Sequence, residues 1–165
     1  MCGIVGAIAQ RNVSQILLEG LSRLEYRGYD SAGICTISNG EQHCIKTTGK
    51  VKNLKEAVKE KGCPGFIGIA HTRWATHGIP SETNAHPHIC ENLALVHNGI
   101  IENFASLKED LLKQGYQFKS QTDTEVLVCL IHSHLKNSSS IFEAFKKALK
   151  VVKGSFGLAL IDKND

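Results

Sequence analysis

The chain has 165 residues, of which 42% are hydrophobic and 21% charged, the composition of one ordinary soluble globular domain. Its 19 basic and 16 acidic residues give a net charge of +3 and are spread along the chain, so we expect no nucleic-acid partner. No stretch reaches the roughly 18 apolar residues of a membrane span, and the first apolar run is too short for a secretory leader. We therefore expect a cytoplasmic protein with no membrane partner.

The chain opens with a predicted buried strand over residues 3–9. A helix is expected next, because Asn12 and Gln15 form a plausible capping pair and the apolar residues that follow recur at helical spacing, namely Val13, Ile16, Leu17, Leu21 and Leu24. The runs 32–38 and 41–47 flank Asn39-Gly40, a strong hairpin signal because a type I′ turn needs positive φ at both central residues.

The rest of the chain predicts four helices and three strands. The expected helices lie at about 51–61, 103–114, 123–135 and 140–152, and the expected strands near 66–72, 93–97 and 156–161. The last two helices begin with the capping-box patterns Thr122-x-x-Glu125 and Ser140-x-x-Glu143. Hairpin-like strands and consecutive helices favour an α+β fold with antiparallel sheets. Because the chain stops just after a strand, we expect a fragment of a longer protein.

The second residue of the chain is a cysteine. Removal of Met1 would leave Cys2 with both a thiol and a free α-amine, whose usual pKa of about 7.7–8.0 makes it a base near neutral pH. One residue would then supply a nucleophile and the base that activates it. Taken alone, an unreactive cysteine at this position is the simpler interpretation.

Three polar segments follow predicted helices or strands, where loops often carry function: EYRGYDSAG at 25–33, HTRWATHG at 71–78 and VHNGIIEN at 96–103. In the last one, Asn98 offers a side-chain amide and Gly99 a backbone N–H that other groups can approach closely, and the two together suit a tetrahedral oxyanion. A simple turn at Asn98-Gly99 is the alternative.

A metal site is a further possibility. His86-Pro87-His88 lies close to Cys90, and His71 and His77 form a second group. A polar loop that contains proline is the competing interpretation. The six cysteines form no C-x-x-C pair, which argues against a zinc ribbon or a thioredoxin motif, and most are expected to be buried reduced thiols.

Six segments are more specific together than any one alone: MCGIVG (1–6), YRGYDSAG (26–33), HTRWATHG (71–78), NAHPH (84–88), HNG (97–99) and TDTE (122–125). Their combination resembles the class II glutamine amidotransferase family over the whole chain. The tyrosines beside Arg27-Gly28 and the HTRWATHG block resemble its glucosamine-6-phosphate synthase branch. The resemblance implies an N-terminal-nucleophile fold, a four-layer αββα sandwich with antiparallel sheets.

The resemblance also implies roles for individual residues. Cys2 would attack the side-chain amide of L-glutamine, and Asn98 with Gly99 would hold the oxyanion. The substrate-binding residues would be Arg73, Thr76 and His77 for the α-carboxylate, Asp123 for the α-ammonium, Trp74 in a loop that closes over the site, and Arg27 near the chain terminus. No metal or organic cofactor is implied, and His86 and His88 take structural or loop roles.

In that family, residues 1–165 correspond to a glutaminase domain that is expected to be incomplete. The partners implied are L-glutamine and the sugar-isomerase domains of the full-length enzyme, which this sequence lacks, and the full-length enzyme is expected to be a homo-oligomer. Two alternatives remain within this interpretation. The ammonia could serve another acceptor, as in amidophosphoribosyltransferases, or the chain could be a non-catalytic glutamine-binding fragment.

Overall fold

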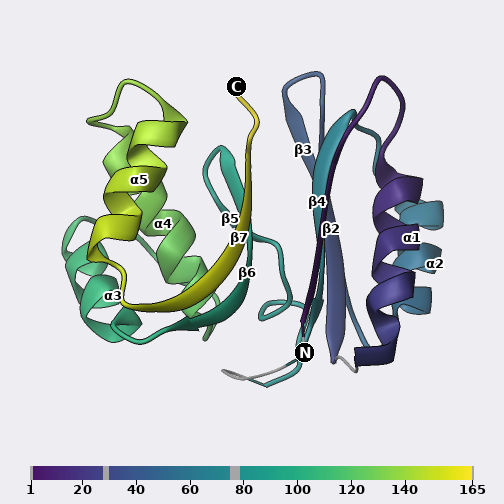
Figure 1. Ribbon diagram of the computed structural model, residues 1–165, viewed down its shortest axis with the longest axis horizontal. Helices are drawn as coiled ribbons and strands as arrows, with labels where there is room; N and C mark the ends of the chain where they lie inside the picture. The colour runs from purple at the N-terminus through teal and green to yellow at the C-terminus, as the bar shows by residue number, and fades with distance from the viewer. Residues whose placement is uncertain (1, 28–29, 75–78, 165) are drawn as a thin grey trace.

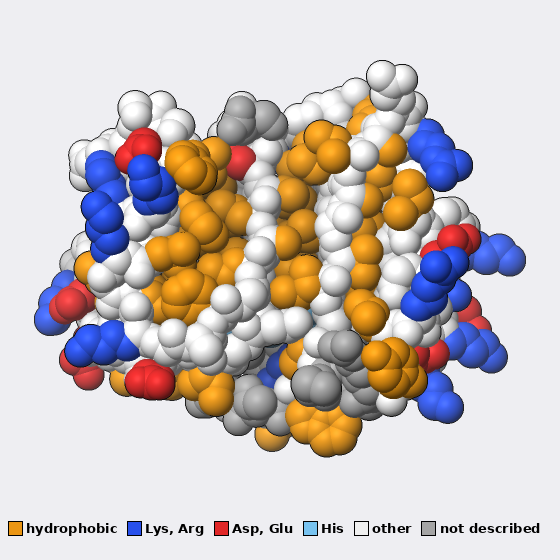
Figure 2. Space-filling view, in the orientation of Figure 1, with side chains coloured by type: hydrophobic (Ala, Val, Ile, Leu, Met, Phe, Trp, Pro, Cys, Tyr) orange, Lys and Arg blue, Asp and Glu red, His pale blue; other side chains and the backbone are white. Residues whose placement is uncertain are grey.

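The computed structural model describes residues 2–27, 30–74 and 79–164, without the side chain of Arg27. Its elements form four layers in the order helices, sheet, sheet, helices (Figure 1). Figure 2 shows hydrophobic side chains between the layers and charged side chains along the outer helices. The expected α+β fold with an αββα arrangement is confirmed.

The first sheet has four antiparallel strands in the order β1-β4-β2-β3. They are β1 (Gly3–Ile8), β2 (Ser31–Ser38), β3 (Glu41–Thr48) and β4 (Ile67–Arg73). Helices α1 (Ser14–Leu24) and α2 (Val51–Lys61) cover the outer face, and a short 3-10 turn, η1 (Glu25–Arg27), follows α1. The apolar stripe of α1 is buried as its spacing predicts, with Leu17 and Leu21 fully inaccessible.

The predicted hairpin is confirmed. Strands β2 and β3 pair antiparallel with Ser38 opposite Glu41, and the two residues between them have φ of 52° at Asn39 and 74° at Gly40. The start of α1 differs from the prediction. The helix begins at Ser14, and Asn12 instead accepts a hydrogen bond from the Ser14 backbone N–H at 3.0 Å.

The second sheet has three antiparallel strands in the order β5-β6-β7. They are β5 (His88–Cys90), β6 (Leu93–Ile101) and β7 (Gly154–Asp162). Helices α3 (Phe104–Lys113), α4 (Asp123–Leu135) and α5 (Ile141–Val151) cover its outer face. Helix α4 lies in the middle of this cluster, and its residues 123–131 are all buried.

The inner faces of the two sheets pack against each other through small and branched side chains. This inter-sheet cluster comprises Cys35, Ile69, Ala94, Val96 and Ile161. The packing brings β4 and β6 together, so the ends of strands far apart in the sequence meet. Cys2 and Asn98 lie at this meeting point.

The predicted end of one strand of the second sheet was wrong, and another strand of it was not predicted. Strand β6 does not end at residue 97 but continues to Ile101, with Asn98 paired to Gly157 and Gly99 to Phe156, so Asn98-Gly99 is not a turn. The segment around His88 forms a short strand where a polar loop was an alternative. A three-residue strand is too short to give a periodic signal.

All six cysteines are free, and four of them are buried: Cys35, Cys63, Cys90 and Cys129. Within the described part of the chain, no helix is long and apolar enough to cross a bilayer. Among the same residues, no group of three or more His, Cys, Asp or Glu side chains is placed to hold a metal ion.

Candidate active site

Cys2 lies at the start of β1, an edge strand that pairs with β4. The Gly3 N–H donates to the Thr72 hydroxyl at 3.1 Å, which holds the chain start against β4. The Cys2 sulfur lies 3.1 Å from the backbone N of Trp74, directly beyond the end of that strand. Two anchors therefore fix Cys2 beside the HTRWATHG segment.

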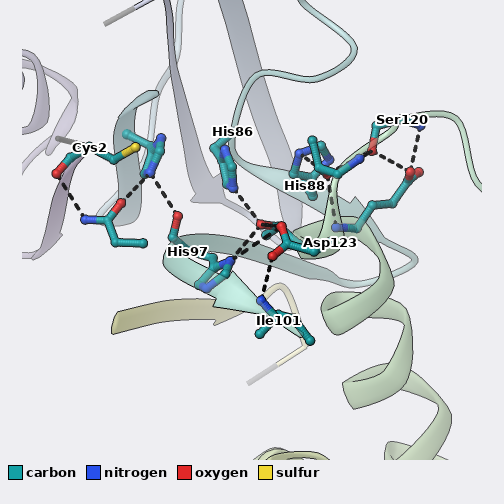
Figure 3. A network of polar contacts seen from close by, with 12 residues as sticks. Cys2, His86, His88, His97, Ile101, Ser120 and Asp123 are labelled. Atoms are coloured by element: carbon teal, nitrogen blue, oxygen red, sulfur yellow. Dashed lines mark hydrogen bonds and ion pairs between the residues drawn. The ribbon is translucent and has the colours of Figure 1, made fainter. Parts of the chain in front are cut away.

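Asn98 reaches Cys2 from the other sheet. Its Nδ2 donates to the Cys2 carbonyl oxygen at 3.2 Å, although 96 residues separate them in the sequence. Its Oδ1 accepts from Nε2 of His71 at 2.8 Å (Figure 3). Packing of the two sheets thus places an amide donor next to the cysteine.

Gly99 adopts a backbone conformation that side chains disfavour, with φ of 136°. A Cβ at this position would overlap the carbonyl oxygen of Ser155 on the neighbouring strand β7. Glycine is therefore required here for β7 to pair closely with β6.

Arg73 ends β4 with its side chain almost fully buried, at 3% exposure. Its Nη1 lies 3.3 Å from Oδ1 of Asp30, and the Asp30 backbone N–H donates to the Arg73 carbonyl oxygen at 2.7 Å. A buried guanidinium needs such a partner because desolvation of an isolated charge is costly. The Asp30 contact holds the guanidinium in place.

Asp123 is the first residue of α4 and is 6% exposed. Its Oδ2 accepts from the Ile101 backbone N–H at 2.8 Å, and its Oδ1 lies 3.9 Å from Nδ1 of His97. The helix N-terminus is a favourable place for a carboxylate because of the helix dipole. A negative charge is thus held at the end of β6, three residues beyond Asn98 along the strand.

The buried histidines His86, His88 and His97 lie close to the start of α4, where Asp123 stands (Figure 3). The Thr124 hydroxyl lies 2.8 Å from Nε2 of His86 and 3.0 Å from Nδ1 of His97. The Thr122 hydroxyl lies 2.9 Å from Nε2 of His88. His86 and His88 therefore pack β5 and its preceding loop against the start of α4, the structural role expected for them.

Burial governs the charge of this cluster. Desolvation lowers the pKa of His71 to about 4 and holds the pKa of His86 and of His88 well below the usual 6.5. Burial also lowers the pKa of His97, although the Asp123 carboxylate opposes that shift. The histidines are accordingly neutral at physiological pH.

Comparison with known proteins decides the family. A model of the glutamine amidotransferase domain matches residues 71–165, more than half of the chain. The chain belongs to the glutamine amidotransferase domain family.

Curated relatives are similar in sequence to this amidotransferase domain along nearly its whole length. It is 54% identical to the glutamine–fructose-6-phosphate aminotransferase (isomerizing) of Shewanella oneidensis over 100% of the chain, and 56% identical to that of Haemophilus influenzae over 98%. The chain spans about 27% of the length of these relatives.

Solved structures share the fold. The domain superposes on the glutamine phosphoribosylpyrophosphate amidotransferase of B. subtilis with a TM-score of 0.82 at 28% identity, covering 99% of this chain and 35% of that one. A structure described as the allosteric regulatory enzyme of purine biosynthesis gives 0.84 at 29% identity, covering 99% and 36%.

The structure brings together four of the nine residues expected to form the site of this amidotransferase domain. Cys2 contacts both the backbone N of Trp74 and the side chain of Asn98, and Gly99 adjoins Asn98. Thr76, His77 and the side chain of Arg27 lie outside the described residues. From the sequence, Asp30 had no assigned role and His71 was considered only as a possible metal ligand, although both stand inside the quoted motifs. Their partners lie 43 and 27 residues away in the sequence, so no local pattern could reveal them.

Proposed function

We propose that this chain hydrolyses L-glutamine to glutamate and ammonia, with Cys2 as the nucleophile. The observation that carries the proposal is the contact of Asn98 Nδ2 with the Cys2 carbonyl oxygen at 3.2 Å, which sets an amide donor beside the cysteine. Membership of the glutamine amidotransferase domain family supports glutamine as the substrate.

The first chemical step follows from these positions. After removal of Met1, the Cys2 α-amine takes the thiol proton and the sulfur attacks the δ-carbonyl carbon of glutamine. A C–S bond forms and the carbonyl oxygen becomes an oxyanion. Asn98 Nδ2–H and the Gly99 N–H donate to that oxyanion, and preorganised donors of this kind usually make the largest single contribution to acyl transfer.

The second step releases the products. The C–N bond breaks, the α-ammonium of Cys2 gives its proton to the departing nitrogen, and ammonia leaves a γ-glutamyl thioester. Water then attacks the thioester carbonyl with the α-amine as base, the C–S bond breaks, and glutamate leaves with the thiol restored. No proton or electron is consumed from outside the site.

Recognition of glutamine needs one cation and one anion. The buried Arg73 guanidinium, held by Asp30, would pair with the α-carboxylate, and the buried Asp123 carboxylate would accept the α-ammonium. Thr76 and His77 would assist Arg73, Trp74 would belong to a loop that closes over the site, and Arg27 would lie near the chain terminus.

In the whole protein, we propose that the ammonia is used to convert fructose 6-phosphate to glucosamine 6-phosphate. Relatives at 54% and 56% identity are glutamine–fructose-6-phosphate aminotransferases, whereas the phosphoribosylpyrophosphate amidotransferase is 28% identical. Residues 1–165 would then be part of a glutaminase domain that acts with sugar-isomerase domains in a cytoplasmic homo-oligomer.

A hydrolysis assay with cysteine variants tests the proposal. Release of glutamate from glutamine is measured for the unmodified chain, Cys2→Ala and Cys44→Ala, the last being a matched control because Cys44 is also half-buried and free. Cys2→Ala should abolish hydrolysis, and Cys44→Ala should change the rate less than about twofold. Full activity in Cys2→Ala would refute the assignment, and tight glutamine binding without hydrolysis by the unmodified chain would favour the non-catalytic alternative.

A further inference from the structure

His71 contacts Asn98, the residue whose amide is proposed to bind the oxyanion. It stands on β4 with its side chain fully inaccessible, and its Nε2 lies 2.8 Å from Oδ1 of Asn98 and 3.1 Å from the carbonyl oxygen of His97. Its ring also packs on His86, with a centroid distance of 4.2 Å. The imidazole therefore has one fixed place between the two sheets.

The hydrogen-bond partners determine which nitrogen of His71 carries the proton. A backbone carbonyl oxygen can only accept, so Nε2 must be the donor to His97. Burial makes the ring neutral at physiological pH, which leaves one proton, on Nε2. Nδ1 has no hydrogen-bond partner among the described residues, which agrees with an unprotonated nitrogen there.

This tautomer fixes the direction of the Asn98 amide. The Cys2 carbonyl can only accept, so the NH2 end of Asn98 must face Cys2 and the oxygen end must face His71. A flipped amide would set two donors against each other at His71 and two oxygens against each other at Cys2. Both ends of the amide thus specify the same orientation.

We infer that His71 is a positioning residue for the reaction: by donating to Asn98 Oδ1, it keeps the Asn98 NH2 group turned toward Cys2 and the forming oxyanion. The inference rests on the proposed function. Without the His71 N–H, the Asn98 side chain loses one of the two hydrogen bonds described for it. The Asn98 amide must then be oriented during the reaction. An oxyanion donor is effective because it is preorganised, so we expect removal of the His71 donor to lower kcat.

A double-mutant cycle tests this role in the 165-residue chain. His71→Leu and His71→Met remove the donor, His71→Gln retains an N–H donor of similar reach, and each is combined with Asn98→Ala. The control is His88→Leu, which removes an equally buried histidine that bonds to Thr122 instead of Asn98. The value of kcat is calculated per Cys2 that a γ-electrophilic glutamine analogue labels, so unfolded molecules are not counted, and KM is measured on the same preparations.

Asn98→Ala should lower kcat by about 100-fold to 1000-fold. His71→Leu and His71→Met should lower it by about 10-fold to 100-fold with KM changed less than threefold, and His71→Gln should recover most of the loss. In the Asn98→Ala background, the same His71 changes should cost less than about twofold more. Any effect of His88→Leu should be the same in both backgrounds.

The inference is overturned if the folded His71 variants without a donor keep kcat within twofold. It is also overturned if they lower kcat by the same factor with and without Asn98. If one of the two non-donor variants fails to fold, the other completes the cycle. A chain with no hydrolysis and no labelled Cys2 before any substitution would instead refute the proposed function.

Discussion

Gly99 combines a strained backbone with the proposed role in binding the oxyanion. Its φ of 136° and its closeness to the Ser155 carbonyl leave no room for a side chain. Gly99→Ala should therefore push β6 and β7 apart, lower the melting temperature and reduce glutamine hydrolysis by more than about 100-fold. Gly157→Ala is the control, since a Cβ there meets open space on the strand opposite. Equal melting temperatures and rates for the two variants would contradict this account of Gly99.

The planar guanidinium of Arg73 can form two parallel hydrogen bonds with a carboxylate, which a lysine ammonium cannot. If it binds the α-carboxylate of glutamine, Arg73→Lys should raise KM by about 10-fold or more while kcat falls much less, because a two-point contact becomes one. Arg23→Lys, at an exposed position of α1, should leave both constants unchanged. A KM within twofold of the unmodified chain would exclude Arg73 from carboxylate binding.

Whether the sequence alone reveals the role of a residue depends on how far away in the sequence its contacts lie. Asn98-Gly99 was an oxyanion candidate from chemistry alone, because an amide and a glycine N–H are the groups such a site needs. The alternative of a turn could not be dismissed from sequence, since the pairing of Asn98 with Gly157 depends on a strand more than 50 residues later. The contacts of Asp30 with Arg73 and of His71 with Asn98 were not predicted for the same reason.

The start of α4 carries Asp123, so its capping matters for the site. Thr122 accepts from the Glu125 N–H at 3.4 Å, as the Thr122-x-x-Glu125 pattern predicts. The Glu125 carboxylate differs from a standard capping box, because it accepts from the backbone N–H groups of Lys119 and Ser120 rather than that of Thr122. It thereby fixes the loop that leads into the helix.

Thr122→Ala should destabilise the chain by about 1 kcal/mol, measured by urea unfolding. It also removes the partner of His88, so KM for glutamine should rise through a displaced Asp123. Ser140→Ala removes the corresponding cap of α5, where Ser140 accepts from the Glu143 N–H at 3.2 Å, and should cost similar stability without changing KM. The same KM change in both variants would argue that the α4 cap has no special link to the site.

Elements with strong local signals were predicted within one or two residues, among them the hairpin at Asn39-Gly40 and helices α2 and α4. Propensity and turn chemistry act within a few residues, so they can be read locally. Strand β5 and the last residues of β6 were missed. Their extended form depends on pairing with distant strands and on packing against α4, which local sequence does not encode.

The histidine cluster couples the stability of the whole molecule to pH. In the unfolded chain these rings have the usual pKa of about 6.5, whereas burial lowers the pKa of His71 to about 4 and those of His86 and His88 well below normal. The unfolded state therefore binds more protons between those values, and stability falls as pH drops below about 6.5. Each such histidine contributes a slope of up to about 1.4 kcal/mol per pH unit.

The melting temperature should accordingly decrease steadily from pH 7.5 to pH 5 in a calorimetric series. His88→Gln should flatten the curve, because it removes one ring that the unfolded state protonates. A melting temperature that is constant or rises as pH falls would show that the buried histidines are not neutral in the folded protein.

The four-layer arrangement was expected from the family resemblance, whereas residue patterns alone supported only an α+β fold with antiparallel sheets. The reason is physical: periodicity identifies which face of an element is buried, but it does not say which sheet packs on that face. The site depends on this packing, since Cys2 and Asn98 belong to different sheets.

The central claim is that Cys2 is a processed, nucleophilic chain end. Intact mass spectrometry before and after incubation with a glutamine analogue that carries an electrophile at the γ-position tests it most directly. We expect a starting mass without Met1, then a single adduct that peptide mapping assigns to Cys2 and that excess glutamine prevents. Retained methionine, or labelling of other cysteines with none at Cys2, would contradict it.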